Sequence, residues 1–109
     1  MLNNAEIEVN KLVEEIQGFW EKEVSDIRAV DVTDAPFDMF TIYMKLYDTY
    51  ELKLVYDRST LGININVDGQ FIGLSRLAKE PVYRGFDGCE PENLLHNFKI
   101  LDKTLKAMS

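Results

Sequence analysis

The sequence predicts an α+β fold: a two-layer sandwich in which an N-terminal helix and a C-terminal helix cover one face of a four- or five-stranded antiparallel meander sheet. Three patterns lead to this prediction. Apolar residues recur with helical spacing at both ends of the chain, apolar and polar residues alternate between positions 40 and 74, and Asp68-Gly69 suits a tight hairpin turn. With 109 residues, the chain is expected to form one domain, residues 1–109, around one core.

The first predicted element is an amphipathic helix from about Asn4 to about Glu23. At about 100° per residue, its apolar side chains fall within one stripe about 120° wide, formed by Leu2, Ala5, Val9, Leu12, Val13, Ile16, Phe19 and Trp20. Asn3 and Glu6 have the spacing of a capping box. Gly18 lowers the intrinsic stability of this helix, but the stripe is long enough that the helix is still expected.

The central part of the chain has the two-residue period of strands. Residues 27–32 favour a short strand, and residues 33–38, around Pro36, are predicted to form a connecting loop. Residues 40–47 and 50–56 then alternate between apolar and polar side chains, which is typical of strands with one buried face.

The turn between these two strands determines which residues face each other. An odd-numbered loop, Asp48-Thr49-Tyr50, would set Leu46 opposite Leu52 and keep the apolar side chains together. In the next hairpin, Asp68-Gly69 occupies a two-residue turn, which pairs Val67 with Gln70. The same register sets Ile65 opposite Ile72 and Ile63 opposite Leu74.

Residues 76–86 show no clear period and are expected to form an irregular connection. Pro91 then marks the first turn of a second helix, which continues to about Ala107. Its apolar stripe comprises Leu94, Phe98, Leu101, Leu105 and Met108. With both helices on one face of the sheet, the opposite face is expected to carry Thr41, Tyr43, Lys45, Tyr47, Lys53, Asn64, Asn66 and Phe71.

The negative charge is concentrated at the start of the chain. The formal net charge is −7. Residues 1–38 contain ten acidic and three basic residues, whereas residues 39–109 contain nine of each. This distribution argues against binding to a nucleic-acid backbone or an anionic membrane, both of which require a basic surface. It favours a cationic partner.

The single cysteine and the single histidine lie close together in the sequence, at Cys89 and His96. They are unsuited to a catalytic pair because Asp87, Glu90 and Glu92 oppose ionisation of the thiol. Seven residues of helix also separate them by about 10 Å, whereas a nucleophile and its base need about 3 Å. One Cys and one His do not make a structural zinc site. We therefore expect no catalytic residue, no metal and no cofactor.

The leading hypothesis from sequence is a protein-binding inhibitor without catalytic activity. A small, acidic α+β domain resembles the immunity proteins that bacteria make against their own nuclease toxins, in size, charge and architecture. The resemblance implies a basic protein partner, such as a nuclease-type toxin. The single cysteine and the lack of a signal-peptide pattern favour a cytoplasmic location. The residues expected to bind this partner are exposed acids and aromatic residues: Glu14, Glu21, Asp31, Asp34, Asp38, Tyr43, Tyr47 and Phe71.

Two alternatives remain open. The first is a small enzyme or ligand-binding domain with a cleft near residues 76–96, whose polar groups would be Arg76, Arg84, Asp87 and His96. The second is a self-associating module that pairs through an exposed strand edge. No apolar run reaches the ~20 residues of a membrane span, and the N-terminal residues lack the pattern of a signal peptide.

Overall fold

The structure, a computed structural model, describes residues 4–83 and 90–108. One open antiparallel sheet of five strands, in the order β1-β2-β3-β4-β5, follows the N-terminal helix and precedes the C-terminal helix. These elements confirm the predicted fold class. Their bounds are α1 (Asn4–Trp20), the 3-10 turn η1 (Glu21–Glu23), β1 (Val24–Thr33), β2 (Met39–Leu46), β3 (Tyr50–Asp57), β4 (Thr60–Val67), β5 (Gln70–Gly73), α2 (Leu74–Leu77) and α3 (Pro91–Met108).

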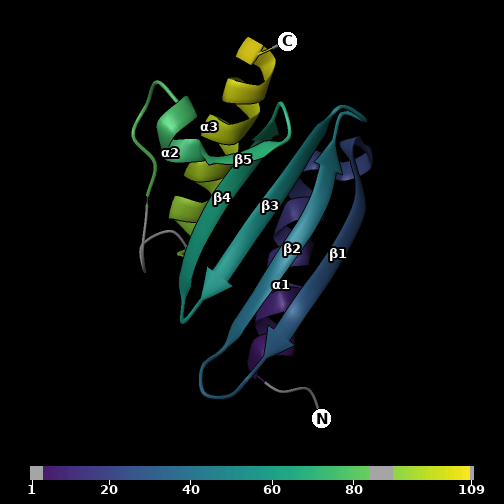
Figure 1. Cartoon of the computed structure of the whole chain (residues 1–109), viewed down its shortest axis with the longest axis vertical. Helices are drawn as coiled ribbons and strands as arrows, with labels where there is room; N and C mark the ends of the chain where they lie inside the picture. Colours follow the sequence, from purple (N-terminus) through teal and green to yellow (C-terminus); the bar gives the residue numbers. More distant parts are fainter. Residues whose placement is uncertain (1–3, 84–89, 109) are drawn as a thin grey trace.

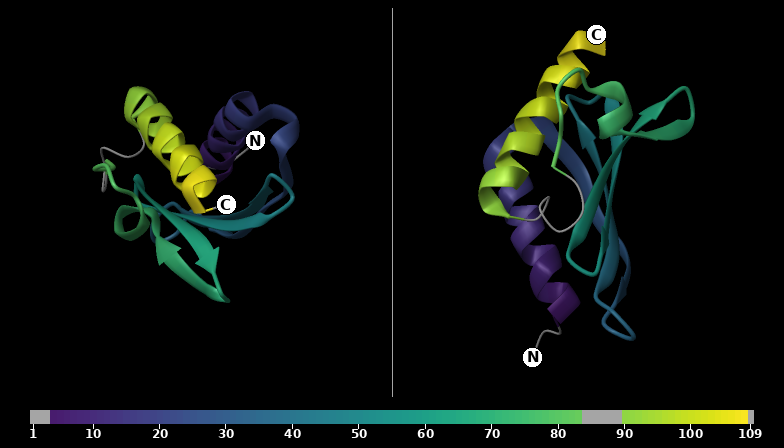
Figure 2. Two further views of the ribbon diagram at one scale, coloured as in Figure 1. Left: turned by 90° about the horizontal axis from the view of Figure 1, so that it is seen from above. Right: turned by 90° about the vertical axis from the view of Figure 1, so that its left-hand side faces the viewer.

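Both long helices lie on the same face of the sheet (Figure 1), and the two further views in Figure 2 show this layer from above and from the side. Helix α1 lies behind β1 and β2 in Figure 1, and α3 lies behind β4. The beginning of α1 and the β1–β2 loop are at one end of the molecule, and the end of α3 is at the other. None of the described helices has the length and apolar character needed to span a membrane.

The core fills the space between the helices and the sheet. Alternate side chains of β2, β3 and β4 are buried, as the two-residue period predicts: Phe40, Ile42, Met44, Leu46, Leu52, Leu54, Tyr56, Leu61, Ile63 and Ile65. Phe98 of α3 lies 4.8 Å from the Trp20 ring and 5.7 Å from the Phe19 ring, between ring centroids. This aromatic group joins α1 to α3. Met108, expected in the α3 stripe, is exposed because the helix extends beyond the sheet at its end.

The β2–β3 connection has the predicted length of three residues, but its position differs by one. It consists of Tyr47-Asp48-Thr49, and Leu46 pairs with Tyr50 instead of Leu52. Tyr47 and Asp48 both adopt positive φ angles, of 55° and 53°, so the chain leaves the ladder one residue earlier. The Tyr47 hydroxyl then donates a hydrogen bond to Asp102 of α3. The placement of Tyr47 on the helix-free face was therefore wrong.

The β4–β5 hairpin has the predicted register, with Val67 opposite Gln70 and Ile65 opposite Ile72. The expected pairing of Ile63 with Leu74 does not form. Strand β5 ends at Gly73, and Leu74 begins α2, because burying its side chain, which is 2% exposed, draws the chain out of the ladder. A short helix thus replaces the start of the predicted irregular connection.

Strand β1 is longer than predicted and forms one edge of the sheet. It runs from Val24 to Thr33, and its pairing with β2 is interrupted near Asp26 and near Asp31. Both aspartates have positive φ angles, of 54° and 55°. Such irregularities and charges on an edge strand hinder pairing with another chain. Helix α1 also ends earlier than predicted, at Trp20, because Glu21 has a φ of 51° and continues into η1.

A buried asparagine attaches the connection that follows α2 to helix α3. The Asn97 side chain is 3% exposed; its amide nitrogen donates to the Tyr83 carbonyl and its amide oxygen accepts from the Tyr83 N–H, both at 2.9 Å. The side chain therefore satisfies the backbone groups of Tyr83 as a neighbouring strand would. Asn97 was not recognised from the sequence, because a polar residue beside the apolar stripe reads as solvent-facing.

Asp102 connects α3 to α1 and to the β2–β3 turn. Its carboxylate accepts hydrogen bonds from the Tyr47 hydroxyl and from the Trp20 indole nitrogen, the latter at 3.1 Å. It also forms a salt bridge of 2.9 Å with Lys106. Partial burial acts to raise the pKa of Asp102, but the bonds from Tyr47, Lys106 and Trp20 outweigh it and hold the pKa below its ordinary value of 3.8.

Acid should therefore weaken the fold through Asp102. Because its pKa is lower in the folded state than in the unfolded chain, the carboxylate stabilises the fold at neutral pH, and this contribution is lost as the pH falls below about 4. Urea unfolding of wild type and Asp102→Asn between about pH 7 and pH 2 measures the effect. We expect the difference in unfolding free energy between the two proteins to shrink with acid. A difference independent of pH would contradict this role.

Candidate protein-binding surface

The acidic residues of the N-terminal third gather along one edge of the molecule. They lie on α1, η1, β1 and the β1–β2 loop, and α1 packs against β1 and β2. Glu6 aside, the only salt bridge that these acids make within the described residues is the one at 3.5 Å between the exposed Lys11 and the partly exposed Glu8. Within the described residues, and Glu6 aside, no Lys or Arg of the later elements forms a salt bridge with these acids.

The strongest crowding of negative charge occurs where the start of α1 meets the β1–β2 loop. The pKa of Asp38 is raised, first because its side chain hydrogen-bonds with Asp34, and further by partial loss of hydration and by the charges of Asp34 and Glu8. Carboxylates that crowd in this way repel one another. The structure thus brings together Asp34 and Asp38, two of the predicted binding residues, and adds Glu8, which is 30 residues away from Asp38 in the sequence.

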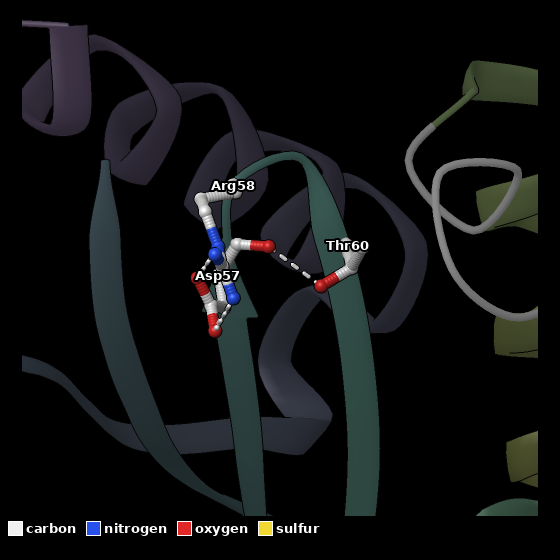
Figure 3. Close-up of polar contacts among 3 residues, drawn as sticks. All are labelled: Asp57, Arg58 and Thr60. Atoms are coloured by element: carbon white, nitrogen blue, oxygen red, sulfur yellow. Dashed lines mark hydrogen bonds and ion pairs between the residues drawn. The ribbon is translucent and has the colours of Figure 1, made fainter. Parts of the chain in front are cut away.

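A neighbouring arginine does not neutralise this group. Arg58, in the β3–β4 turn, donates its backbone N–H to the Asp38 carbonyl at 2.9 Å. Its guanidinium, however, binds the carboxylate of Asp57 at 2.8 Å and 3.3 Å, as Figure 3 shows, and Thr60 closes the turn through the Asp57 carbonyl. The same guanidinium lies 4.7 Å from the centre of the Phe37 ring. The cation is engaged with its own turn and with Phe37.

Exposed apolar side chains accompany these acids. Phe37 is 47% exposed in the loop, and Val32 and Met39, on either side of the loop, are also exposed. We call residues 31–39, which comprise the β1–β2 loop and the adjoining strand ends, the acidic loop. Its three aspartates were predicted from sequence as binding residues, but Phe37 was not, although a large aromatic residue between two aspartates in a loop is itself a signal of an exposed contact.

Apart from the acidic loop, the surface has a hollow lined by residues of both long helices. Its walls are Glu14, Glu15, Gly18 and Phe19 of α1, and Leu95 and Phe98 of α3, around a volume of about 380 Å³. We call it the interhelical furrow. A neighbouring hollow of about 290 Å³ shares Glu14 and Glu15 and continues between the helices and the sheet, where it is lined by Leu12, Tyr56, Leu61 and Leu94. Apolar side chains and glutamates line both hollows, and the neighbouring hollow is also lined by Lys11, whose side chain is paired with Glu8.

The other predicted binding residues lie apart from the acidic loop. Glu21 is exposed in η1, about 20 Å along the helix from Glu8 at 1.5 Å per residue. Tyr43 and Phe71 are on the helix-free face of the sheet, 6.2 Å apart between ring centroids. There Arg28 lies 5.0 Å from the Tyr43 ring and Lys53 lies 5.7 Å from the Phe71 ring. The structure therefore groups the aromatic candidates with cations, away from most of the acids.

The residues proposed for a small enzyme do not form a site within the described part of the chain. His96 contacts the Pro81 carbonyl through Nε2 at 3.2 Å and packs edge-on against Tyr83, so it helps to attach the connection to α3. Arg76 is exposed in α2. A hollow of about 440 Å³ does lie between α2 and α3, but neither residue lines it. Arg84, Asp87 and Cys89 lie outside the described residues.

Among residues 4–83 and 90–108, no three His, Cys, Asp or Glu side chains are placed to share a metal ion. Comparison with protein-family models, with curated proteins and with solved structures finds no match for this chain. A functional assignment therefore depends on the surface just described.

Proposed function

We propose that this protein is a non-catalytic inhibitor that binds a basic protein through its acidic edge. The type of protein that fits best is a bacterial immunity protein, acting in the cytoplasm against a basic, nuclease-type toxin. The observation that supports the proposal is the excess of negative charge on α1, β1 and the acidic loop, together with the close approach of Glu8, Asp34 and Asp38 at one end of this surface.

Solubility alone would not require this arrangement. Dispersed surface charges keep a small protein in solution, and alternating signs avoid repulsion. Here the pKa of Asp38 is raised by its hydrogen bond with Asp34 and, after partial loss of hydration, by repulsion from the charges of Asp34 and Glu8. A basic partner would relieve that repulsion on binding, and the surrounding negative potential would accelerate its approach. The exposed Phe37 would supply an aromatic contact at the same place.

Of the residues selected from sequence, Glu14, Asp31, Asp34 and Asp38 belong to the proposed surface together with Glu8, Glu15 and Phe37. Glu21 would extend it toward the end of α1. Tyr43 and Phe71 stay separate candidates on the helix-free face. Tyr47 is the weakest candidate, because its hydroxyl is already bonded to Asp102.

Affinity capture at low salt tests this function. The immobilised chain is exposed to extract of the native cell and eluted with a salt step. The expected result is one basic protein that is released as salt rises, because ionic strength screens contacts between exposed charges. The recovered protein should then lose its nuclease activity when the chain is added back in solution. Capture of only acidic or neutral proteins, or a recovered protein whose activity is unaffected, would contradict the proposal.

A further inference from the structure

Gly18 occupies an unusual position for a glycine. It lies within α1 on the wall of the interhelical furrow, and a Cβ atom built there would have no heavy atom within 4 Å other than its chain neighbours and the backbone of its own helix. The fold itself therefore gives no steric reason for glycine, whereas glycine in place of alanine lowers helix stability by about 0.5–1 kcal/mol. Glycine at this position lowers the stability of α1, but its lack of a side chain would let the backbone of a binding partner come close to the furrow wall.

The furrow beside Gly18 combines apolar and acidic groups. Leu95 of α3 is 44% exposed, and Phe19 and Phe98 also line the furrow. Glu14 and Glu15 stand on the α1 side, and within the described residues neither forms a salt bridge. A purely apolar partner would leave these carboxylates without a counter-charge and partly dehydrated, which is unfavourable.

We infer that the interhelical furrow is the docking site for an amphipathic basic segment of the partner. Apolar side chains of this segment contact Phe19 and Leu95, its backbone passes close to Gly18, and Lys or Arg side chains meet Glu14 and Glu15. The inference rests on the proposed function and specifies where on the protein that function is carried out. It places the main contact on the helix layer, with the acidic loop as a neighbouring region that attracts the same partner.

A pair of synthetic helical peptides provides the probe. Both have Leu at spacings of three and four residues; one has Lys and the other Glu at the remaining positions. Calorimetry measures their affinity for the full chain at low ionic strength, and amide and methyl NMR shifts locate the contact. We expect the Lys peptide to bind with the largest shifts at Gly18 and Leu95, and the Glu peptide not to bind.

Gly18→Leu is the decisive variant. Leucine has a far higher helix propensity than glycine, so the variant should fold at least as well as wild type, while its side chain fills the furrow. We expect it to weaken binding of the Lys peptide by about tenfold or more, equivalent to about 1.4 kcal/mol. The matched control is Gln17→Leu, which adds the same side chain at an adjacent exposed position that does not line the furrow.

The possible results test the furrow as docking site separately from the proposed inhibitor function. Shifts confined to residues 31–39, equal binding of both peptides, no binding of the Lys peptide, or an affinity unchanged by Gly18→Leu would each overturn the furrow as the docking site. Inhibition of a captured basic partner that persists undiminished in Gly18→Leu would also overturn it, while leaving the proposed function intact. Lys-peptide binding in the furrow without any basic protein in the capture experiment would support the site and contradict the inhibitor role.

Discussion

Replacing Glu14, Asp34 and Asp38 together with lysine is expected to slow association with the basic partner by about tenfold to a hundredfold at low salt. The three positions lie in α1 and in the acidic loop, so the change reverses the potential along the edge that the partner approaches. Stopped-flow association rates measured from about 20 mM to about 500 mM salt provide the test. The rate for wild type should fall steeply with salt, and the rate for the variant should hardly change.

A control with the same change in net charge distinguishes local from overall electrostatics. Glu51, Asp68 and Glu92 are exposed acids of β3, the β4–β5 turn and α3, away from the acidic loop. Replacing these three with lysine should change the association rate much less than the first variant does. If both triple variants slow association equally, total charge is responsible and the acidic edge has no special role. Circular dichroism would verify that both variants are folded.

Phe98→Ala should produce the largest loss of stability, about 3–5 kcal/mol. The Phe98 ring is 1% exposed and contacts both Trp20 and Phe19, so its removal leaves a cavity at the junction of the two helices. Small domains have a total stability of about 5–15 kcal/mol, and a loss of this size would populate the unfolded chain or lower the melting temperature markedly. Guanidinium unfolding at neutral pH measures it.

Two further substitutions, one at Phe98 itself and one at Leu95, serve as controls for this loss of stability. Phe98→Leu keeps the site apolar and most of its volume, and should cost less than about 1.5 kcal/mol. Leu95→Ala, one turn earlier on the exposed side of α3, should have an effect within about 0.5 kcal/mol. A loss below about 1 kcal/mol for Phe98→Ala would show that α1 and α3 are not held together by the aromatic group. Since Phe98 also lines the furrow, the same variant should impair docking there.

Local sequence patterns accounted for the parts of the fold that depend on one element or one hairpin. The period of two placed Ile42, Leu54 and Ile63 on the buried face of the sheet. Asp68-Gly69 determined the β4–β5 register because a two-residue turn leaves only one pairing that keeps the apolar residues together. The β2–β3 turn was placed one residue late, because positive φ angles at Tyr47 and Asp48 are not encoded by apolar periodicity.

The candidate site could be predicted only in part from the sequence. The excess of acids in residues 1–38 is a property of composition, and their exposure follows from their position outside the apolar stripe of α1. Their grouping is not local: Glu8 comes near Asp38 only because α1 packs on the β1–β2 side of the sheet. The interhelical furrow likewise requires two helices 70 or more residues apart in sequence, so Gly18 and Leu95 carried no recognisable signal by themselves.

The amino-acid sequence alone thus determined the order and type of the main elements, the face that each strand buries and the excess negative charge of the first third, because these follow from side-chain period and composition. Tertiary packing determined that the Arg58 guanidinium pairs with Asp57 of its own turn and not with the aspartates of the acidic loop. It also determined which acids lie close together and where a furrow lies between α1 and α3. These are contacts between distant segments, and their geometry depends on how α1 and α3 are seated on the sheet rather than on any local pattern.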